Sequence, residues 1–152
     1  MVMTKEMRIG ALKLKFLVDD QASDGKATMF EMTVPEQARV PAPHHHRDVD
    51  EIVYGLGGTL TMTVDGVAHE IKAGDSVFVA RGAVHQFQNL HPGDARVLSM
   101  LTPGSIGTAY FEELAKVVNA SGPPNLAKVK DIMLRHGLVP AQPTEQPSRN
   151  CG

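Results

Sequence analysis

Short stretches with alternating apolar and polar side chains follow one another between residues 7 and 101. In the stretch from 7 to 18, Leu12, Leu14 and Phe16 alternate with lysines, and side chains two residues apart share one face of a β-strand. The chain holds 14 glycines and 10 prolines, many of them between these stretches, where they favour turns. The pattern predicts a mainly β fold, in the form of a small β-barrel or jelly roll.

Further strands are expected where the same alternation recurs, over residues 27–34, 58–71, 77–79, 85–89 and 96–101. Asp65-Gly66 lies at the centre of one of them and predicts a type I′ hairpin turn there. After Pro103 the apolar period becomes helical, which predicts two short helices. They are expected over residues 106–119 and 125–136. We therefore predict three segments: a β domain over 1–102, a helical appendage packed on it or on a partner over 103–139, and a flexible tail over 140–152.

Length and charge exclude several classes of function. A chain of 152 residues with a formal net charge of −2 forms one domain by default and has no electrostatic reason to bind nucleic acid or an anionic membrane. No apolar run is long enough to span a membrane, and the N-terminus lacks the apolar core of a signal peptide. The only cysteine, Cys151, has no internal disulfide partner. We expect a cytoplasmic protein.

Three consecutive histidines, His44 to His46, stand before an apolar stretch that begins after Glu51. On an extended strand His44 and His46 share one face, whereas His45 points to the other. Two imidazoles on one face offer a divalent ion two nitrogen ligands, and Glu51 can add an oxygen once the chain has turned back. A third imidazole would hold the ion well, and the candidate is His85. If the register of the strand were shifted, His45 would replace one of its neighbours.

These two stretches resemble the paired signature motifs of the cupin superfamily, small β-barrels that usually hold a metal ion. The first motif joins a His-x-His pair to a glutamate and then a glycine, and its residues here are His44, His46, Glu51 and Gly58, without the leading glycine. The second motif is matched by Gly74, Gly82, His85 and Asn89, with Ala80 where the family usually has proline. Each motif has the internal spacing that is usual in the family, and the two motifs occur in the usual order along the chain. The resemblance covers residues 25–102.

The resemblance implies one divalent transition metal ion, held by His44, His46, Glu51 and His85. Three neutral imidazoles and a carboxylate suit iron, manganese, nickel, cobalt, copper or zinc, and leave an octahedral ion two open positions. A redox-active ion would support dioxygenase chemistry, and a redox-silent one would act as a Lewis acid in an isomerase, lyase or decarboxylase. A third alternative is a cupin that binds a small ligand without turnover. Glu51 is the candidate general base.

Within the superfamily the chain resembles single-domain cupins similar to quercetin 2,3-dioxygenases. This favours a metal-dependent dioxygenase for a small, largely apolar molecule, in a homodimer that pairs through an edge strand, for which the segment with Leu12, Leu14 and Phe16 is the candidate. Counting by twos from Glu51 places Val53 and Gly55 on the interior face, and Gly55 is expected to open space below the metal. The predicted pocket residues are Phe30, Met32, Val53, Gly55, Phe87 and Met100.

Overall fold

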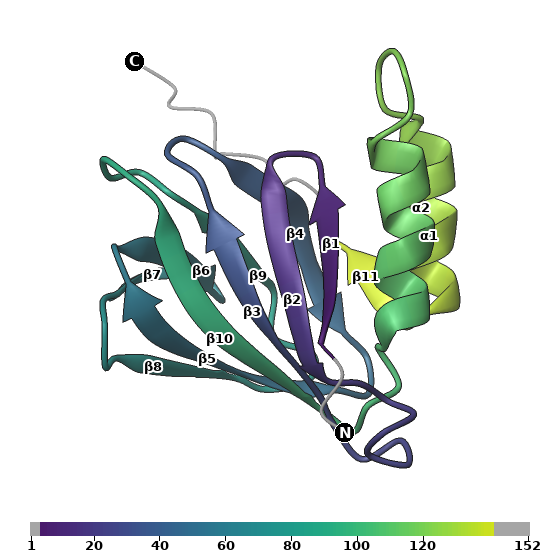
Figure 1. Ribbon diagram of the computed structural model, residues 1–152, viewed down its shortest axis with the longest axis horizontal. Helices are drawn as coiled ribbons and strands as arrows, with labels where there is room; N and C mark the ends of the chain where they lie inside the picture. Colours follow the sequence, from purple (N-terminus) through teal and green to yellow (C-terminus); the bar gives the residue numbers. More distant parts are fainter. Residues whose placement is uncertain (1–3, 142–152) are drawn as a thin grey trace, which may run out of the picture.

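The computed structural model describes residues 4–141, apart from the side chains of residues 39–41, and shows two antiparallel β-sheets and two helices. The sheets lie face to face, and α1 and α2 stand together at one side of them (Figure 1). In spatial order, the larger sheet comprises β1 (Lys5–Ile9), β2 (Leu12–Val18), β3 (Thr28–Val34), β10 (Ala95–Thr102), β5 (Asp50–Gly57) and β8 (Ser76–Val79). The smaller sheet comprises β11 (Leu138–Pro140), β4 (Arg39–His46), β9 (His85–Gln88), β6 (Leu60–Val64) and β7 (Val67–Ile71).

This arrangement confirms the mainly β jelly roll that the sequence predicts. Among the described residues the two sheets keep separate hydrogen-bond ladders, so the fold is a two-sheet sandwich, which is the jelly-roll form of the prediction and not a closed barrel. Every second residue of β3 is buried, beginning with Thr28 and Phe30, and the same alternation buries Ala95, Val97 and Ser99 of β10. These buried side chains belong to the core, and the removal of their apolar surface from water stabilises the fold.

The hairpin of β6 and β7 turns at Asp65 and Gly66, whose φ angles are 47° and 82°. Two consecutive positive φ angles define the type I′ turn, which confirms the prediction for this dipeptide. The prediction of a single strand over residues 7–18 is wrong. Gly10 adopts a φ of 58°, and the chain turns there to form the hairpin of β1 and β2. Leu12 and Leu14 face the core of their own chain. The homodimer expected from this segment stays a prediction.

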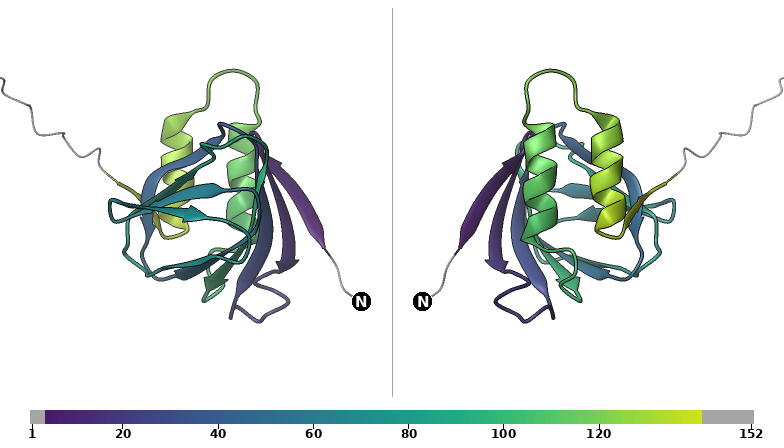
Figure 2. Two further views of the ribbon diagram at one scale, coloured as in Figure 1. Left: turned by 90° about the vertical axis from the view of Figure 1, so that its left-hand side faces the viewer. Right: turned by 90° about the vertical axis from the view of Figure 1, so that its right-hand side faces the viewer.

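The two predicted helices are observed as α1 (Thr108–Val118) and α2 (Leu126–Arg135). Asn125 caps α2, because its side-chain oxygen accepts a hydrogen bond from the backbone N–H of Lys128 at 3.1 Å. The helices pack against each other and stand side by side in front of the sheets (Figure 2, right). No helix among residues 4–141 is both long and apolar enough to cross a bilayer.

Both ends of the helical pair are attached to the sheets. After α1, Asn119 accepts a hydrogen bond from the backbone N–H of Gly10 and donates one to the carbonyl of Arg8, each at 2.8 Å. After α2, the short strand β11 pairs with β4, and no pattern in the sequence predicts this strand. The helices therefore lie beside the strand that carries the three histidines. The tail predicted over 140–152 lies outside the described residues from position 142 onward, as does Cys151.

Candidate metal centre

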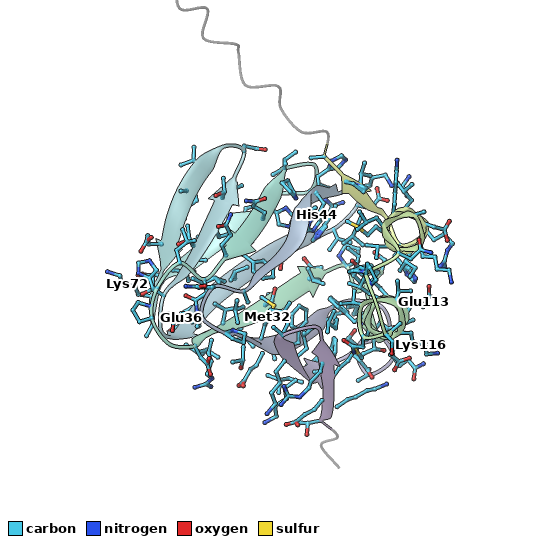
Figure 3. All side chains as sticks on the ribbon, turned by 90° about the horizontal axis from the view of Figure 1, so that it is seen from above. Met32, Glu36, His44, Lys72, Glu113 and Lys116 are labelled. Atoms are coloured by element: carbon cyan, nitrogen blue, oxygen red, sulfur yellow. The ribbon has the colours of Figure 1, made fainter. Side chains whose placement is uncertain are left out.

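Strand β4 carries two of the predicted ligands into the space between the sheets. His44 and His46 are buried at 4% and 5% exposure, whereas His45 between them is only partly buried, so the predicted alternation is confirmed. His85 of β9 lies directly opposite His44 in the register of the two strands and is also buried. Seen from above, His44 and Met32 lie between the sheets, while Glu113 and other polar side chains lie on the outer side of α1 (Figure 3).

The structure brings the three predicted imidazoles together. A ring nitrogen from each of His44, His46 and His85 lies within 4.8 Å of the other two, and the Nε2 atoms of His44 and His46 are 3.2 Å apart. Glu51 lies next to this group: its Oε2 is 3.4 Å from Nε2 of His85. The three histidines thus form a compact nitrogen cluster, and the Glu51 carboxylate lies beside His85.

The loop before His85 is fixed at both of its ends. Asp50 accepts hydrogen bonds from the backbone N–H of Arg81 at 2.9 Å and from its guanidinium at 3.0 and 3.2 Å. Asp65 accepts a bond from the backbone N–H of Val84 at 2.9 Å. Between them Gly82 has a φ of 85°, which only glycine adopts easily, and its N–H donates to the carbonyl of His46 at 2.7 Å. The second motif thus ties the third imidazole to the strand that carries the first two.

Ser99 on β10 positions the carboxylate. Its hydroxyl donates a hydrogen bond of 2.6 Å to Oε1 of Glu51, and this leaves Oε2 directed at His85. Sequence reasoning missed Ser99, since a single serine in an alternating strand carries no distinctive signal. Asn89, the last residue of the second motif, has a structural role: its amide donates to the carbonyls of Val34 and Gly93 at 3.0 and 2.7 Å.

The buried groups have strongly perturbed pKa values. Burial and repulsion from the neighbouring imidazoles lower the pKa of His44 to about 3, and burial lowers that of His46 to about 4. Burial opposes ionisation of Glu51, but hydrogen bonds from His85 and Ser99 together with the nearby imidazoles lower its pKa to about 2. Burial also acts against charge on His85, yet its hydrogen bond to Glu51 raises its pKa overall. Without a metal, these shifts favour the charged forms of Glu51 and His85 over those of His44 and His46.

The donor set fits a divalent transition metal ion. Nδ1 of His44 and Nδ1 of His85 each donate to a backbone carbonyl, of Ala42 and Ala83 respectively, at 3.0 Å. When both rings are neutral, their Nε2 atoms carry lone pairs that can bind an ion, because in a neutral imidazole only one ring nitrogen carries the proton. Nδ1 of His46 is buried without a hydrogen-bond partner among the described residues. Lone pairs concentrated in this way are costly to bury without a cation.

A cavity of about 80 Å³ extends from the histidines between the sheets and α1. The predicted pocket residues Phe30, Met32 and Phe87 line it. Apart from the hydroxyl of Tyr110, its other walls are apolar, and they come largely from segments to which the sequence assigned no role in the site. These are Ile9, Leu12 and Leu14 of the first hairpin, Met62, Leu101 and Leu138 of other strands, and Ile106, Tyr110, Phe111 and Leu114 at α1. The amphipathic pattern of α1 predicted that its apolar face is buried, but it did not predict which part of the protein covers that face.

Three predicted pocket residues do not line the cavity. Val53 faces inward but is buried within the core. Met100 pairs with Ile52, which is exposed, so it belongs to the outer face of the sheet, and its neighbour Leu101 faces inward instead. Gly55 faces inward, but the backbone of Lys72 occupies the space where its side chain would stand. The expectation that Gly55 opens space below the metal is therefore wrong.

Residues 30–101 match the family model described as the cupin domain. The fold is shared with a predicted oxalate decarboxylase from Thermotoga maritima, at a TM-score of 0.59 and 24% identity over 67% of this chain and 93% of that one. A sugar phosphate isomerase of the cupin superfamily from Silicibacter pomeroyi gives a TM-score of 0.51 at 24% identity, over 59% of each chain. The cupin domain of an XRE family transcriptional regulator from Enterobacter cloacae gives 0.54 at 22% identity, over 60% of this chain and 96% of that one.

No curated protein matches the sequence. At these identities the likeness to solved structures shows the fold alone. Residues 30–101 are thus similar to the cupin domain, and the two sheets form a jelly roll in which three histidines could hold a metal ion.

Proposed function

We propose that this chain is a mononuclear metal-dependent oxidoreductase of the dioxygenase type, similar to the quercetin 2,3-dioxygenase-like cupins, that acts on a small and largely apolar organic molecule. His44, His46, His85 and Glu51 would hold the ion. The observation that carries the proposal is the compact cluster of three imidazoles, within 4.8 Å of one another, at the polar end of an otherwise apolar cavity. When bound, a redox-active ion would supply the electron-transfer chemistry that dioxygen needs to react with an organic substrate.

The protein's own groups would orient the substrate and move one proton. Oε2 of Glu51 lies 3.4 Å from Nε2 of His85, while the hydroxyl of Ser99 holds Oε1 at 2.6 Å. This carboxylate is thus placed to accept the proton of a substrate hydroxyl, which would turn an enol or catechol into its more reactive anion. The apolar walls, among them Phe30 and Met32, would keep water away from that anion.

The second candidate is a Lewis-acid enzyme, an isomerase, lyase or decarboxylase. It is favoured by the same placement of Glu51, since proton transfer by a fixed carboxylate beside a cation needs no redox step. The solved structures of similar fold include a sugar phosphate isomerase and a predicted oxalate decarboxylase. The third candidate, binding without turnover, accords with the cupin domain of the transcriptional regulator. A homodimer in the cytoplasm completes the proposal.

The test begins with elemental analysis of the purified protein and of two variants. His85→Ala should lose the ion, whereas the control His45→Ala should retain it, because His45 lies on the other face of the same strand. Protein loaded in turn with each of the candidate metals is then assayed for oxygen consumption with catechols, β-diketones and flavonols. Turnover that persists without oxygen and with zinc would favour the Lewis-acid enzyme. A stoichiometric ion with no oxygen uptake on any of these substrates would refute the dioxygenase proposal.

A further inference from the structure

A second, larger cavity lies between the helical pair and the sheets. This outer cleft measures about 520 Å³ and is lined by residues of β1, β4, β9, α1 and α2. Its lining is mainly apolar and includes Val129 and Met133 on the inward side of α2 and Leu126 at the start of that helix. Leu126 is 76% exposed, so the cleft is open to solvent at this end.

The outer cleft and the inner cavity share part of their walls. Ile9, Phe87, Tyr110 and Leu114 line both, so only a layer of side chains separates the two spaces. The inner cavity, at about 80 Å³, is smaller than the roughly 300–1,000 Å³ of typical small-molecule sites. A substrate larger than a few non-hydrogen atoms cannot lie wholly within it. The outer cleft is the adjoining space on the far side of that layer of side chains.

Polarity changes sharply from the histidine end of the inner cavity to the outer cleft. Among the residues that line the inner cavity, the three histidines and Glu51 form one polar end, and Tyr110 is the only other polar side chain. Burial raises the pKa of Tyr110, so its hydroxyl keeps its proton and can donate a hydrogen bond. Beyond Tyr110, the lining of the outer cleft is mainly apolar, with Val129 and Met133 among its residues, and its polar side chains are Gln86 and Gln88. A molecule that fits it has a compact polar head and an apolar body.

We propose that the inner cavity and the outer cleft form one substrate site, with the polar head at the histidines and an apolar chain or ring passing between Phe87 and Leu114 into the cleft. The substrate class is an amphiphilic small molecule whose head carries two oxygen donors. Val129, Met133 and Leu126 set the length of apolar body that is accepted. This inference rests on the proposed metal site and specifies what binds there.

Straight-chain hydroxamic acids are suitable probes, since each has the same two-oxygen head and differs only in chain length. Their binding to the Co²⁺-loaded protein can be followed by the visible absorption of the ion and by calorimetry, without any turnover. Acetohydroxamic acid should bind, and longer chains should bind about threefold to fourfold more tightly for each methylene that enters the cleft. The control Leu134→Trp, on the solvent-exposed side of α2, should leave this dependence on chain length unchanged.

Val129→Trp should remove the gain with chain length while acetohydroxamic acid binds as before, because the indole would fill the cleft and not the inner cavity. Leu126→Trp, at an exposed position that the fold does not need, should weaken the longest probes even if the Val129 variant folds poorly. Short and long probes that bind the wild-type protein equally would overturn the single-site proposal and leave the metal site intact; this result is also expected if another protein occupies the cleft. Failure of acetohydroxamic acid itself would refute the metal site, and this inference with it.

Discussion

Replacement of Gly55 by alanine should destabilise the protein, although the change adds a single methyl group in a strand. A Cβ at this position would lie 2.7 Å from the carbonyl carbon of Lys72, 3.1 Å from Cγ2 of Ile71 and closer still to the carbonyl oxygen of Lys72. The backbone cannot move aside easily, because it is held by two hydrogen bonds. The N–H of Gly55 donates to the backbone carbonyl of Asp75 at 2.8 Å, and the carbonyl of Gly55 accepts from the N–H of Gly74 at 3.0 Å. The new methyl group must therefore displace main-chain atoms.

Overpacking of this kind costs about 1–3 kcal/mol or more. Gly57, on the same strand, is the matched control, because nothing lies within 4 Å of its Cβ position. Gly57→Ala should therefore be neutral or stabilise by up to about 1 kcal/mol, through the lower entropy of the unfolded chain. For a chain of this size the melting temperature of Gly55→Ala should fall by roughly 2–12 °C.

Thermal and urea unfolding of both variants, followed by circular dichroism in the presence of a chelator, measures this difference without a contribution from bound metal. If Gly55→Ala melts at or above the temperature of Gly57→Ala, the close approach of Lys72 is not a feature of the folded protein in solution. Loss of probe binding at unchanged stability would instead support the earlier expectation that Gly55 borders the substrate.

Two further predictions concern the metal centre. Ser99→Ala removes the hydrogen bond that orients Glu51, and should weaken metal affinity by about 10- to 100-fold with little change in fold; calorimetric affinities equal to wild type would show that Ser99 does not position the carboxylate. Metal affinity should also decrease as the pH is lowered, because His85 then binds a proton that competes with the metal. The pKa of His85 is raised above its usual 6.5, whereas those of His44 and His46 are lowered to about 4 or below. Between the pKa of His85 and about pH 4, binding must displace one proton, which predicts about a tenfold loss of affinity per pH unit; a loss of a hundredfold or more per unit would contradict the assigned protonation states.

Several features of the candidate site depend only on local sequence and could be predicted. His44 and His46 share a face because a strand has a period of two, and the spacing from Gly82 to His85 sets the turn that delivers the third imidazole. Asp65-Gly66 fixed its own turn, since aspartate and glycine tolerate positive φ angles in adjacent positions. Each of these predictions concerns residues a few positions apart, whose geometry is set by the backbone itself.

Other features depend on contacts between distant segments. Met100 and Leu101 are both apolar, so alternation alone could not tell which of them faces the core, and only pairing with β5 decides this. The approach of Lys72 to Gly55 joins residues that the sequence treats as unrelated. The sequence thus determined the alternating strands and the shared face of His44 and His46, because both follow from short-range periodicity, whereas His85 meets them through the pairing of β9 with β4. The docking of α1, and with it the size and lining of the cavity, was decided by tertiary packing, since an amphipathic helix specifies that one face is buried but not which surface covers it.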